Sequence, residues 1–507
     1  MTKYLTSVIP GPAVKQRDDR GIQDGRDAFL NVPNSSGNAI PMTLSDAIIE
    51  GNLSEVESHL KKGGTINYLD EYGFTPLIQA AIVKNNDIAV LLLKAGARVD
   101  IVDASGQTAL HWAIDHDNND LVQMLLKQGA NPNSYTAHGQ PALFYPILRG
   151  RKPLINMLIQ HGADINFAKD YINAKLIGHR YELQGLCNIV NANGAFIEID
   201  LEGFYLEFTI DIIRDSLIRF LNSYEAHRMR LPENEIQTII QSFKNASYLR
   251  EYKHYSKVAE QHRDNIQELI KMDLLLLPVS YRGHAITIVK HGDFLAKCDR
   301  GVKKMTDPIV INTMGQQAPL NLEFYMSLLY KRQTDRFLKT DLYNILDLHP
   351  FVKLPITHQI TGNCSWANVE ASVPTMLFML LYDKAKQESS KEKMVTQCMD
   401  FYKTWGQWDK DRSLEDWVLD FDKATFTRQK SKCDLMGSIL FQACNPQKQT
   451  DITRAKRILT YLMRPHFKFV LRSYCNVYLR GSRTPPEGRR FKALLDACGV
   501  DMNSIIQ

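Results

Sequence analysis

The feature that most constrains this chain is a sequence pattern that recurs every 33 residues. Glycine opens the pattern at Gly73–Leu77, Gly106–His111 and Gly139–Phe144. A fixed period of this length indicates similar supersecondary units, each of which buries its apolar face against the next. The sequence therefore predicts a solenoid. A second glycine series keeps the same interval at Gly63, Gly96, Gly129 and Gly162.

The residues inside each unit indicate two short helices. Thr75 is placed to accept a backbone N–H at the start of the first helix, and Pro76 suits the first helical turn. Gly96 stands just past the second helix, where a left-handed residue is favoured. A 33-residue period with a Thr-Pro-Leu start resembles the ankyrin family. The resemblance implies four to five repeats over residues 42–190, the last of them degenerate near residues 173–179.

The rest of the chain divides by composition and periodicity. Residues 1–41 are rich in Gly, Pro, Asn and charge, which predicts a partly flexible leader. Residues 191–385 mix helical and strand-like stretches, and residues 386–507 are predicted to be helical and packed on that domain. The expected fold class is a multidomain α+β chain with an N-terminal α-solenoid and a helical C-terminal region.

Strand periodicity is strongest in the middle of the chain. Leu274–Val279, Ala285–Val289 and Phe294–Cys298 predict three strands, with a tight turn at Gly292. Ile309–Ile311 predicts a fourth strand.

Two flanking segments carry further predictions. Phe196–Leu201 alternates like a strand, and Phe204–Phe208 continues that period as the second arm of a hairpin. Helices are expected to return over Leu320–Leu348.

One of the eight cysteines stands in a context suited to catalysis. Cys364 precedes a helix-compatible run, and a helix N-terminus lowers a thiol pKa. His284 opens the second predicted strand, and Asp299 follows the third across the turn at Gly292. An antiparallel hairpin makes those two ends neighbours, so Asp299 can orient the imidazole toward the thiol. Gln359 is placed to donate an amide N–H to a developing oxyanion.

The order His, Asp, Gln, Cys resembles clan CE cysteine peptidases, which include adenain, the Ulp/SENP proteases and the YopJ-type acetyltransferases. The resemblance covers residues 270–385 and implies a cysteine-protease-like α+β domain. It also implies a role for each residue. His284 would be the general base, Asp299 its orienting acid, Cys364 the nucleophile and Gln359 the oxyanion donor.

The chain departs from that family pattern at two positions. Ala285 stands where many relatives carry Trp, and Ser365 where Ulp-type enzymes carry Gly. A buried packing thiol, a strand-end histidine, a turn-capping aspartate and a loop glutamine are the structural alternatives for the four candidate residues. Asp293 is a second candidate for the acid.

Composition narrows the classes of function. The net charge of +5 over 507 residues argues neither for nor against a nucleic-acid partner, no clear nucleic-acid site is found, and the loop Arg483–Arg490 is expected to be solvated. The cysteines show neither C-x-x-C nor zinc spacing, so we expect free thiols and no metal site. No nucleotide-binding motif is present, so no cofactor is expected. The sequence has no secretory-type N-terminus and no apolar run that spans a bilayer.

Ankyrin repeats joined to such a domain resemble effectors that intracellular bacteria such as Legionella inject into host cells. The resemblance implies type IV secretion, action in the host cytosol or nucleus, and repeats that bind a host protein. The thiol domain would then hydrolyse peptide or isopeptide bonds, as a deubiquitinase does. Two alternatives are a non-catalytic scaffold, in which the domain is a pseudoenzyme, and a YopJ-type acetyltransferase that uses acyl-CoA.

Overall fold

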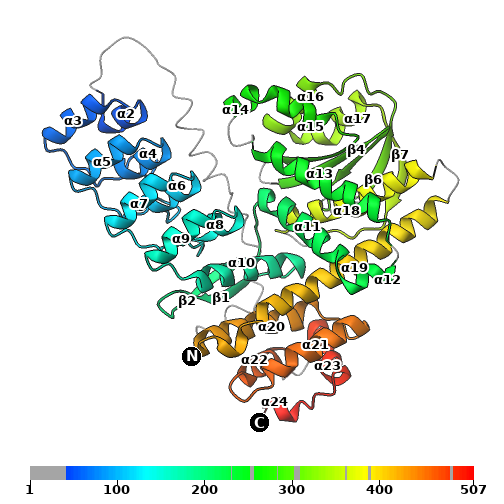
Figure 1. Ribbon diagram of the computed structural model, residues 1–507. Coiled ribbons are helices and arrows are strands. Elements are labelled where there is room, and N and C mark those ends of the chain that lie inside the picture. Colours follow the sequence, from blue (N-terminus) through cyan, green and yellow to red (C-terminus); the bar gives the residue numbers. More distant parts are fainter. Residues whose placement is uncertain are drawn as a thin grey trace. The chain divides into compact units, whose positions relative to one another are not determined.

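The chain forms two compact units in the computed structural model (Figure 1). The repeat unit comprises residues up to Ala174 together with 186–200 and 420–435. The thiol unit comprises residues 175–185, 201–419 and 436–507. The expected leader, residues 1–41, lies outside the described residues. The structure describes residues 42–229, 231–251, 256–281, 284–301, 309–359, 362–385, 390–479 and 484–506.

Four helix pairs form the repeat unit, as the 33-residue period predicts. Thr75 caps α4 by accepting the N–H of Ile78 at 3.2 Å, and Pro76 is the first helical residue. Gly96 has φ of +91°, which suits the left-handed position after α5. The pairs are α2 (Leu44–Ile49) with α3 (Leu53–Lys61), α4 (Pro76–Ile82) with α5 (Asn86–Lys94), α6 (Ala109–Asp115) with α7 (Asn119–Lys127), and α8 (Phe144–Leu148) with α9 (Lys152–Gln160).

Asparagine side chains tie neighbouring repeats together. The Asn67 amide donates to the carbonyl of Gly96, and its oxygen accepts from the N–H of Arg98 at 2.8 Å. Asn133, two periods later, makes the same two contacts with Gly162 and Asp164. The repeats therefore share polar bonds at their loops as well as one continuous apolar core.

The segment after the fourth pair differs from the prediction. The region expected to hold a degenerate fifth repeat belongs to one uninterrupted helix, α10 (Ile165–Arg180), whose last residues lie in the thiol unit. Within the repeat unit, the buried carboxylate of Asp170 accepts two bonds from Arg428 at 2.8 and 2.9 Å. That pair attaches the start of α20 (Phe426–Ala443) to α10.

The hairpin near residue 200 was predicted with the wrong partner strand. β2 (Phe196–Asp200) pairs with β1 (Leu186–Val190), which precedes it. The turn between them forms because Asn191 Oδ1 accepts from two backbone N–H groups. The residues predicted as the second arm belong largely to a helix, α11 (Leu206–Leu221), because the apolar period becomes helical from Leu206 onward.

The thiol unit is built on a five-stranded antiparallel meander with strand order β3-β4-β5-β6-β7. Four of the strands match the sequence prediction. The fifth, β7, was not predicted; it begins at Leu348, where the predicted helical stretch ends, and carries Pro350 at the sheet edge, where an unpaired N–H position is tolerated. The strands are β3 (Leu274–Tyr281), β4 (His284–His291), β5 (Phe294–Cys298), β6 (Ile309–Met314) and β7 (Leu348–Leu354).

Helices cover both faces of this sheet. α18 (Cys364–Lys384) packs along β4, where the Thr287 hydroxyl donates to the carbonyl of Asn368 at 3.0 Å. The opposite face holds an apolar cluster in which Ile286 and Ile288 meet Leu328 and Leu342. Helices on that side include α16 (Leu322–Tyr330), the π-helical turn η2 (Phe337–Asp341) and α17 (Leu342–Ile345).

The remaining elements of the thiol unit are helical, as predicted for the C-terminal region. No helix in the described ranges is long and apolar enough to cross a membrane. These elements are α12 (Tyr224–Met229), α13 (Glu233–Glu251), α14 (Ser256–Gln261), α15 (Arg263–Ile270), α19 (Lys391–Val418), α21 (Gln449–Leu462), α22 (Lys468–Tyr478), α23 (Pro486–Ala497) and α24 (Asn503–Ile506). The short 3-10 helix η3 (Phe421–Lys423) belongs to the repeat unit.

Two repeat glycines allow a matched test of the junction between repeats. Gly106 and Gly129 both have positive φ, so Ala at either position costs about 1 kcal/mol of backbone strain. A Cβ at Gly106 would also overlap the backbone of Ala137 in the next repeat, whereas a Cβ at Gly129 meets nothing within 4 Å. We expect Gly106→Ala to lower the urea midpoint of the repeat unit clearly more than Gly129→Ala. Equal losses would show that this contact contributes little.

Candidate active site

The register of two strands places His284 and Asp299 on one face of the sheet. Thr287 lies opposite Cys298, so the position that faces Asp299 on β4 is Ile286. Side chains two residues apart on a strand point to the same face, which puts His284 diagonally beside Asp299. The two-residue turn at Gly292, with φ of +51°, sets this register.

His284 and Asp299 are joined by a direct hydrogen bond. His284 Nε2 lies 2.8 Å from Asp299 Oδ1. The Asp299 side chain is 1% exposed, and its Oδ1 also accepts from the N–H of Gly301 at 3.3 Å. The second oxygen lies 3.7 Å from Nζ of Lys297, which is buried on the same face. The carboxylate is therefore held by two cationic groups and one backbone N–H.

Cys364 is the first residue of α18, as predicted. Its thiol and the His284 imidazole lie close enough that each shifts the pKa of the other toward the charged form. Since Nε2 is engaged with Asp299, Nδ1 is the ring nitrogen left for the sulfur. The backbone N–H groups of Ala285 and Ser365 also donate toward the sulfur. The thiol thus sits at a helix N-terminus with three surrounding donors.

These contacts shift the pKa values of the three groups toward a thiolate–imidazolium pair. Burial raises the pKa of Cys364, but the bonds from His284 and Ala285 outweigh it, and the net pKa falls below its usual 9.0. Burial lowers the pKa of His284, yet Asp299 and Cys364 raise it to about 9. Burial also raises the pKa of Asp299, and its bond to His284 brings the net value below 3.8.

Other thiols of the chain behave in the opposite way. Burial raises the pKa of Cys298, Cys398 and Cys444 to about 12, and that of Cys498 above its usual value. A thiol with a raised pKa is inert near neutrality, since the thiolate is the nucleophile. Cys364 differs from these four because it has an imidazole partner.

The Gln359 side chain also lies beside His284, and the residue belongs to the loop that precedes α18. Its backbone N–H donates to the carbonyl of Arg300 at 3.1 Å. A Cβ built on Gly301 would lie 3.3 Å from Gln359 Nε2 and 2.8 Å from His284 Cε1. The amide and the imidazole therefore flank one glycine. Oε1 of Gln359 is buried without a hydrogen-bond partner among the described residues.

The second candidate acid is excluded by its position. Asp293 lies in the turn at the far end of β4 and accepts there from the amide of Gln317. Seven residues of strand separate that turn from His284, roughly 23 Å at the rise of an antiparallel strand. The prediction of Asp293 as the alternative partner of His284 was therefore wrong, and this residue forms part of the turn between β4 and β5.

A residue that sequence reasoning missed holds the three parts of the site together. Asn368 lies one helical turn after Cys364 and is fully buried. Its amide N–H donates to the carbonyl of Ala285 at 2.6 Å, and its oxygen accepts from the N–H of Arg300 at 2.7 Å. Ala285 follows His284 and Arg300 follows Asp299, so one side chain connects the helix to both strands. In the sequence, the only local indication of this role is that Asn368 stands four residues after Cys364, which places both on one face of a helix.

Arg300 anchors the loop that carries Asp299. Its guanidinium is 3% exposed and donates to the carbonyl of Thr357 at 2.8 Å and to Glu182 at 3.0 Å. Glu370 of α18 lies 3.7 Å from the same group. These partners come from three separate stretches of the thiol unit. They restrain the loop between β5 and Gly301, which the hydrogen bond to His284 requires.

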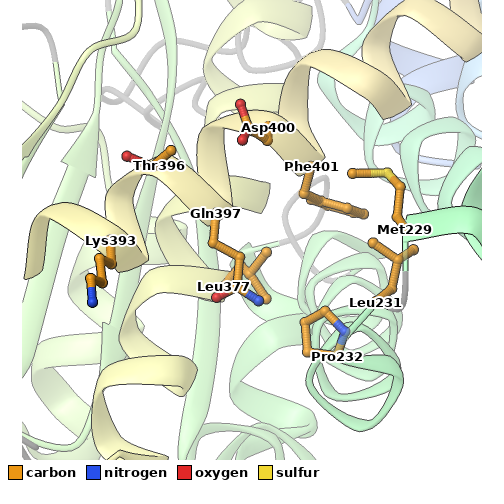
Figure 2. A pocket seen from close by; sticks show the side chains of 9 residues that line it. All are labelled: Met229, Leu231, Pro232, Leu377, Lys393, Thr396, Gln397, Asp400 and Phe401. Atoms are coloured by element: carbon orange, nitrogen blue, oxygen red, sulfur yellow. The ribbon is translucent and has the colours of Figure 1, made fainter. Parts of the chain in front are cut away.

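A separate cavity lies farther along α18. This cavity has a volume of about 360 Å³. Figure 2 shows that side chains of α19 line it on one side and Met229, Leu231 and Pro232 on the other. Its α18 contribution is Leu377, thirteen residues after Cys364, or roughly 20 Å along the helix. Cys364, His284 and Asp299 do not line it. Within the described residues, no group of three or more His, Cys, Asp or Glu side chains is placed to hold a metal.

Comparison with known proteins identifies the class first. A family model described as ankyrin repeats (3 copies) matches residues 44–136 and 105–169, so the chain is an ankyrin-repeat protein. No curated protein matches it. The solved structure of the Legionella effector AnkH is similar, with 38% sequence identity and a TM-score of 0.76, over 91% of this chain and 98% of that one. The chain belongs to the same family as AnkH.

The Asn368 bridge allows a test with a matched control on the same helix. Asn368→Ala leaves a buried carbonyl and a buried N–H unpaired, which should lower the free energy of unfolding by roughly 2–4 kcal/mol. The thiol should also lose reactivity at pH 7, because His284 and Asp299 are no longer held against α18. Ser372→Ala is the control, since that buried hydroxyl bonds only Val369 of its own helix. Unchanged alkylation of Cys364 in Asn368→Ala would contradict a positioning role.

Gly301 offers a steric test of the imidazole position. A methyl group there would lie 2.8 Å from His284 Cε1, so Gly301→Ala should displace the ring and raise the pH at which Cys364 becomes reactive. Gly406→Ala in α19 is the control, because its nearest neighbour is Glu370 Oε1 at 3.8 Å. Rates of iodoacetamide labelling against pH would report both variants. Coincident profiles for Gly301→Ala and the wild type would show that the ring tolerates the methyl group.

Proposed function

We propose that this chain is a bacterial effector with two working parts. The ankyrin repeats bind a host protein, and the thiol unit hydrolyses a peptide or isopeptide bond through Cys364, His284 and Asp299. The observation that carries the second part is the hydrogen-bonded chain Cys364–His284–Asp299 at the start of a helix. That chain of contacts matches what a thiol nucleophile needs, namely a base and an orienting acid.

The proposed reaction follows from the protonation states of these groups. The Cys364 thiolate attacks the carbonyl carbon, and the carbonyl electrons move onto oxygen. Imidazolium His284 then donates its proton to the leaving amine as the C–N bond breaks, which leaves a thioester on Cys364 and a neutral imidazole. That imidazole next removes a proton from water, whose oxygen attacks the thioester. The acid leaves, and the thiolate and the imidazolium are restored.

Two groups are proposed to stabilise the oxyanion. The Gln359 amide lies beside the His284 ring at Gly301, and the backbone N–H groups at the start of α18 point along the positive end of the helix dipole. Asp299 keeps the imidazole in one orientation and offsets its positive charge. Hydrolysis rather than transfer is favoured because the His284 side chain is 25% exposed, so water can reach it.

A purely structural role for the thiol unit explains these contacts less well than catalysis does. A charged thiolate and imidazolium lose hydration on burial, and such pairs seldom add net stability. Groups with perturbed pKa values gathered at one point are typical of functional sites. An acetyltransferase would share the thioester and differ only in the group that accepts the acyl chain.

By analogy with AnkH, described as a Legionella effector, we propose delivery by type IV secretion into a host cell and action in its cytosol or nucleus.

The pH dependence of thiol alkylation tests this proposal. The lowered pKa of Cys364 and the pKa of about 9 for His284 predict a thiolate–imidazolium pair that forms as the pH rises through the lowered pKa of the thiol and is lost when the imidazolium deprotonates near pH 9. Iodoacetamide should therefore label Cys364 at neutral pH, where Cys298, Cys398 and Cys444 stay protonated. Loss of the imidazole in His284→Gln should move the Cys364 midpoint to higher pH. Mass spectrometry of each tryptic cysteine peptide gives the rates.

Substrate trials separate the remaining candidates. Cleavage of ubiquitin-linked or peptide substrates by the wild type but not by Cys364→Ser would support hydrolysis. If the wild type consumes acetyl-CoA and Cys364→Ser does not, the activity of the thiol unit is acetyl transfer rather than hydrolysis. A Cys364 that alkylates only above pH 9, like an ordinary buried thiol, would remove the catalytic proposal and leave the binding role of the repeats in place.

A further inference from the structure

The charge of this chain is unevenly distributed. Residues 436–507, here called the basic segment, contain 12 lysines and arginines but only 4 aspartates and glutamates, a net charge of +8. The whole chain carries +5, so the preceding 435 residues together carry −3. A modest overall charge therefore conceals a strongly basic C-terminal part. Charge asymmetry of this kind points to an anionic partner.

The fold of the basic segment leaves several of its cations at the surface. α21, α22 and α23 pack on one another, and the Phe441 ring lies 4.9 Å from Tyr474 and 5.4 Å from Phe491. α21 and α23 thus bury their apolar faces in a core, whereas Phe469 and Val477 of α22 stay exposed. On α21, Ile458 and Leu462 are buried while Lys456 and Arg457 are exposed on the opposite side.

α23 carries a second exposed group of cations. Arg489, Arg490 and Lys492 are exposed, whereas Phe491 and Leu495 face the core. The end of α23 lies against α21, because the Cys498 thiol contacts the carbonyl of Ile452. Two adjacent helices therefore each present basic side chains. The exposed carboxylates of the segment itself are Glu487, Asp496 and Asp501, and the exposed Glu415 of α19 also lies beside α21.

Neutral carbonyls, rather than carboxylates, orient several of these cations. Arg490 donates to the carbonyl of Phe441 and Arg489 to that of Thr484, both at 2.7 Å. Lys468 donates to Ser504 at 2.9 Å and Arg472 to Ile505 at 3.2 Å. A carbonyl fixes a side chain without cancelling its charge, so the site is ordered and still positive.

Carboxylates in the described residues engage two other arginines of the segment. Arg454 is buried between Asp411 and Asp451, and Arg457 pairs with Glu415 at 2.8 Å. No carboxylate among the described residues forms an ion pair with the six other cations named above. Those cations are Lys456, Lys468, Arg472, Arg489, Arg490 and Lys492.

We propose that the basic segment binds nucleic acid through the phosphate backbone. Eight of its 12 cations are arginines, whose planar fork matches phosphate oxygens and is weakly hydrated. Cations spaced over two helices suit a ligand with regularly repeated charges. A membrane surface is disfavoured because a helix that lies on lipid needs an exposed apolar face, and the cation-bearing helices α21 and α23 bury theirs in the core.

Charge reversal in the full-length protein tests this site. Lys456→Glu with Lys492→Glu changes the net charge by −4 at two exposed positions of the basic segment. Lys94→Glu with Lys127→Glu makes the same change at two exposed positions in the repeats. The probe is a fluorescent RNA duplex of about 20 base pairs, with the DNA duplex of the same sequence in parallel, titrated between roughly 50 and 200 mM salt. Fluorescence anisotropy gives the affinity.

We expect the first pair to weaken duplex binding at least about tenfold and to reduce its salt dependence, while the second pair stays near the wild type. Both pairs should retain the wild-type labelling rate of Cys364, which makes this outcome independent of the thiol chemistry. Equal weakening by both pairs would overturn the proposal, as would no measurable duplex binding. Binding of polyglutamate or of phosphatidylserine vesicles in preference to either duplex would also overturn it, in favour of an acidic protein or a membrane surface.

Discussion

The register between β4 and β5 is the constraint on which the candidate site depends. The turn at Gly292 pairs His291 with Phe294, and every later pair follows from that first one. A slip of one residue would send His284 and Asp299 to opposite faces, because side chains alternate along a strand. The apolar residues between them resist such a slip, since Ile286 and Ile288 would have to leave the core. The packing of the sheet thus protects the 2.8 Å contact at its edge.

Burial and charge act against each other at this contact, and the balance decides the chemistry. Desolvation alone would keep the thiol protonated and the imidazole neutral. Asp299 and the helix N-terminus reverse both tendencies, provided that the three groups stay in contact. The need to keep these three groups in contact explains why buried hydrogen bonds surround them. Asn368 and Arg300 join α18, the β4 edge and the loop after β5, and each bond is made inside the core.

Sequence reasoning succeeded where the signal was local. Repeat periodicity and the Thr75 cap predicted the helix pairs, and alternation predicted four of the five strands. It failed at β7, whose exposed edge position weakens the alternation of apolar residues. It also assigned the wrong partner to β2, because the period continued for several residues into α11. At the site, the approach of His284 to Asp299 followed from the hairpin, whereas the role of Gly301 had no signal in the sequence and that of Asn368 only its spacing from Cys364.

The sequence by itself determined the repeats, the order of the strands and the placement of Cys364 at a helix start, since caps, turns and alternation act over a few residues. Tertiary structure alone decided that the loop after β5 holds Asp299 against His284, because Arg300 anchors that loop to Thr357 and Glu182, which lie far away in the chain. It likewise decided that Asn368 joins α18 to β4 and to the loop after β5, and that several cations of the basic segment lie at the surface. Contacts between residues far apart in the chain depend on how helices and strands pack, and packing sums many weak interactions that no single motif records.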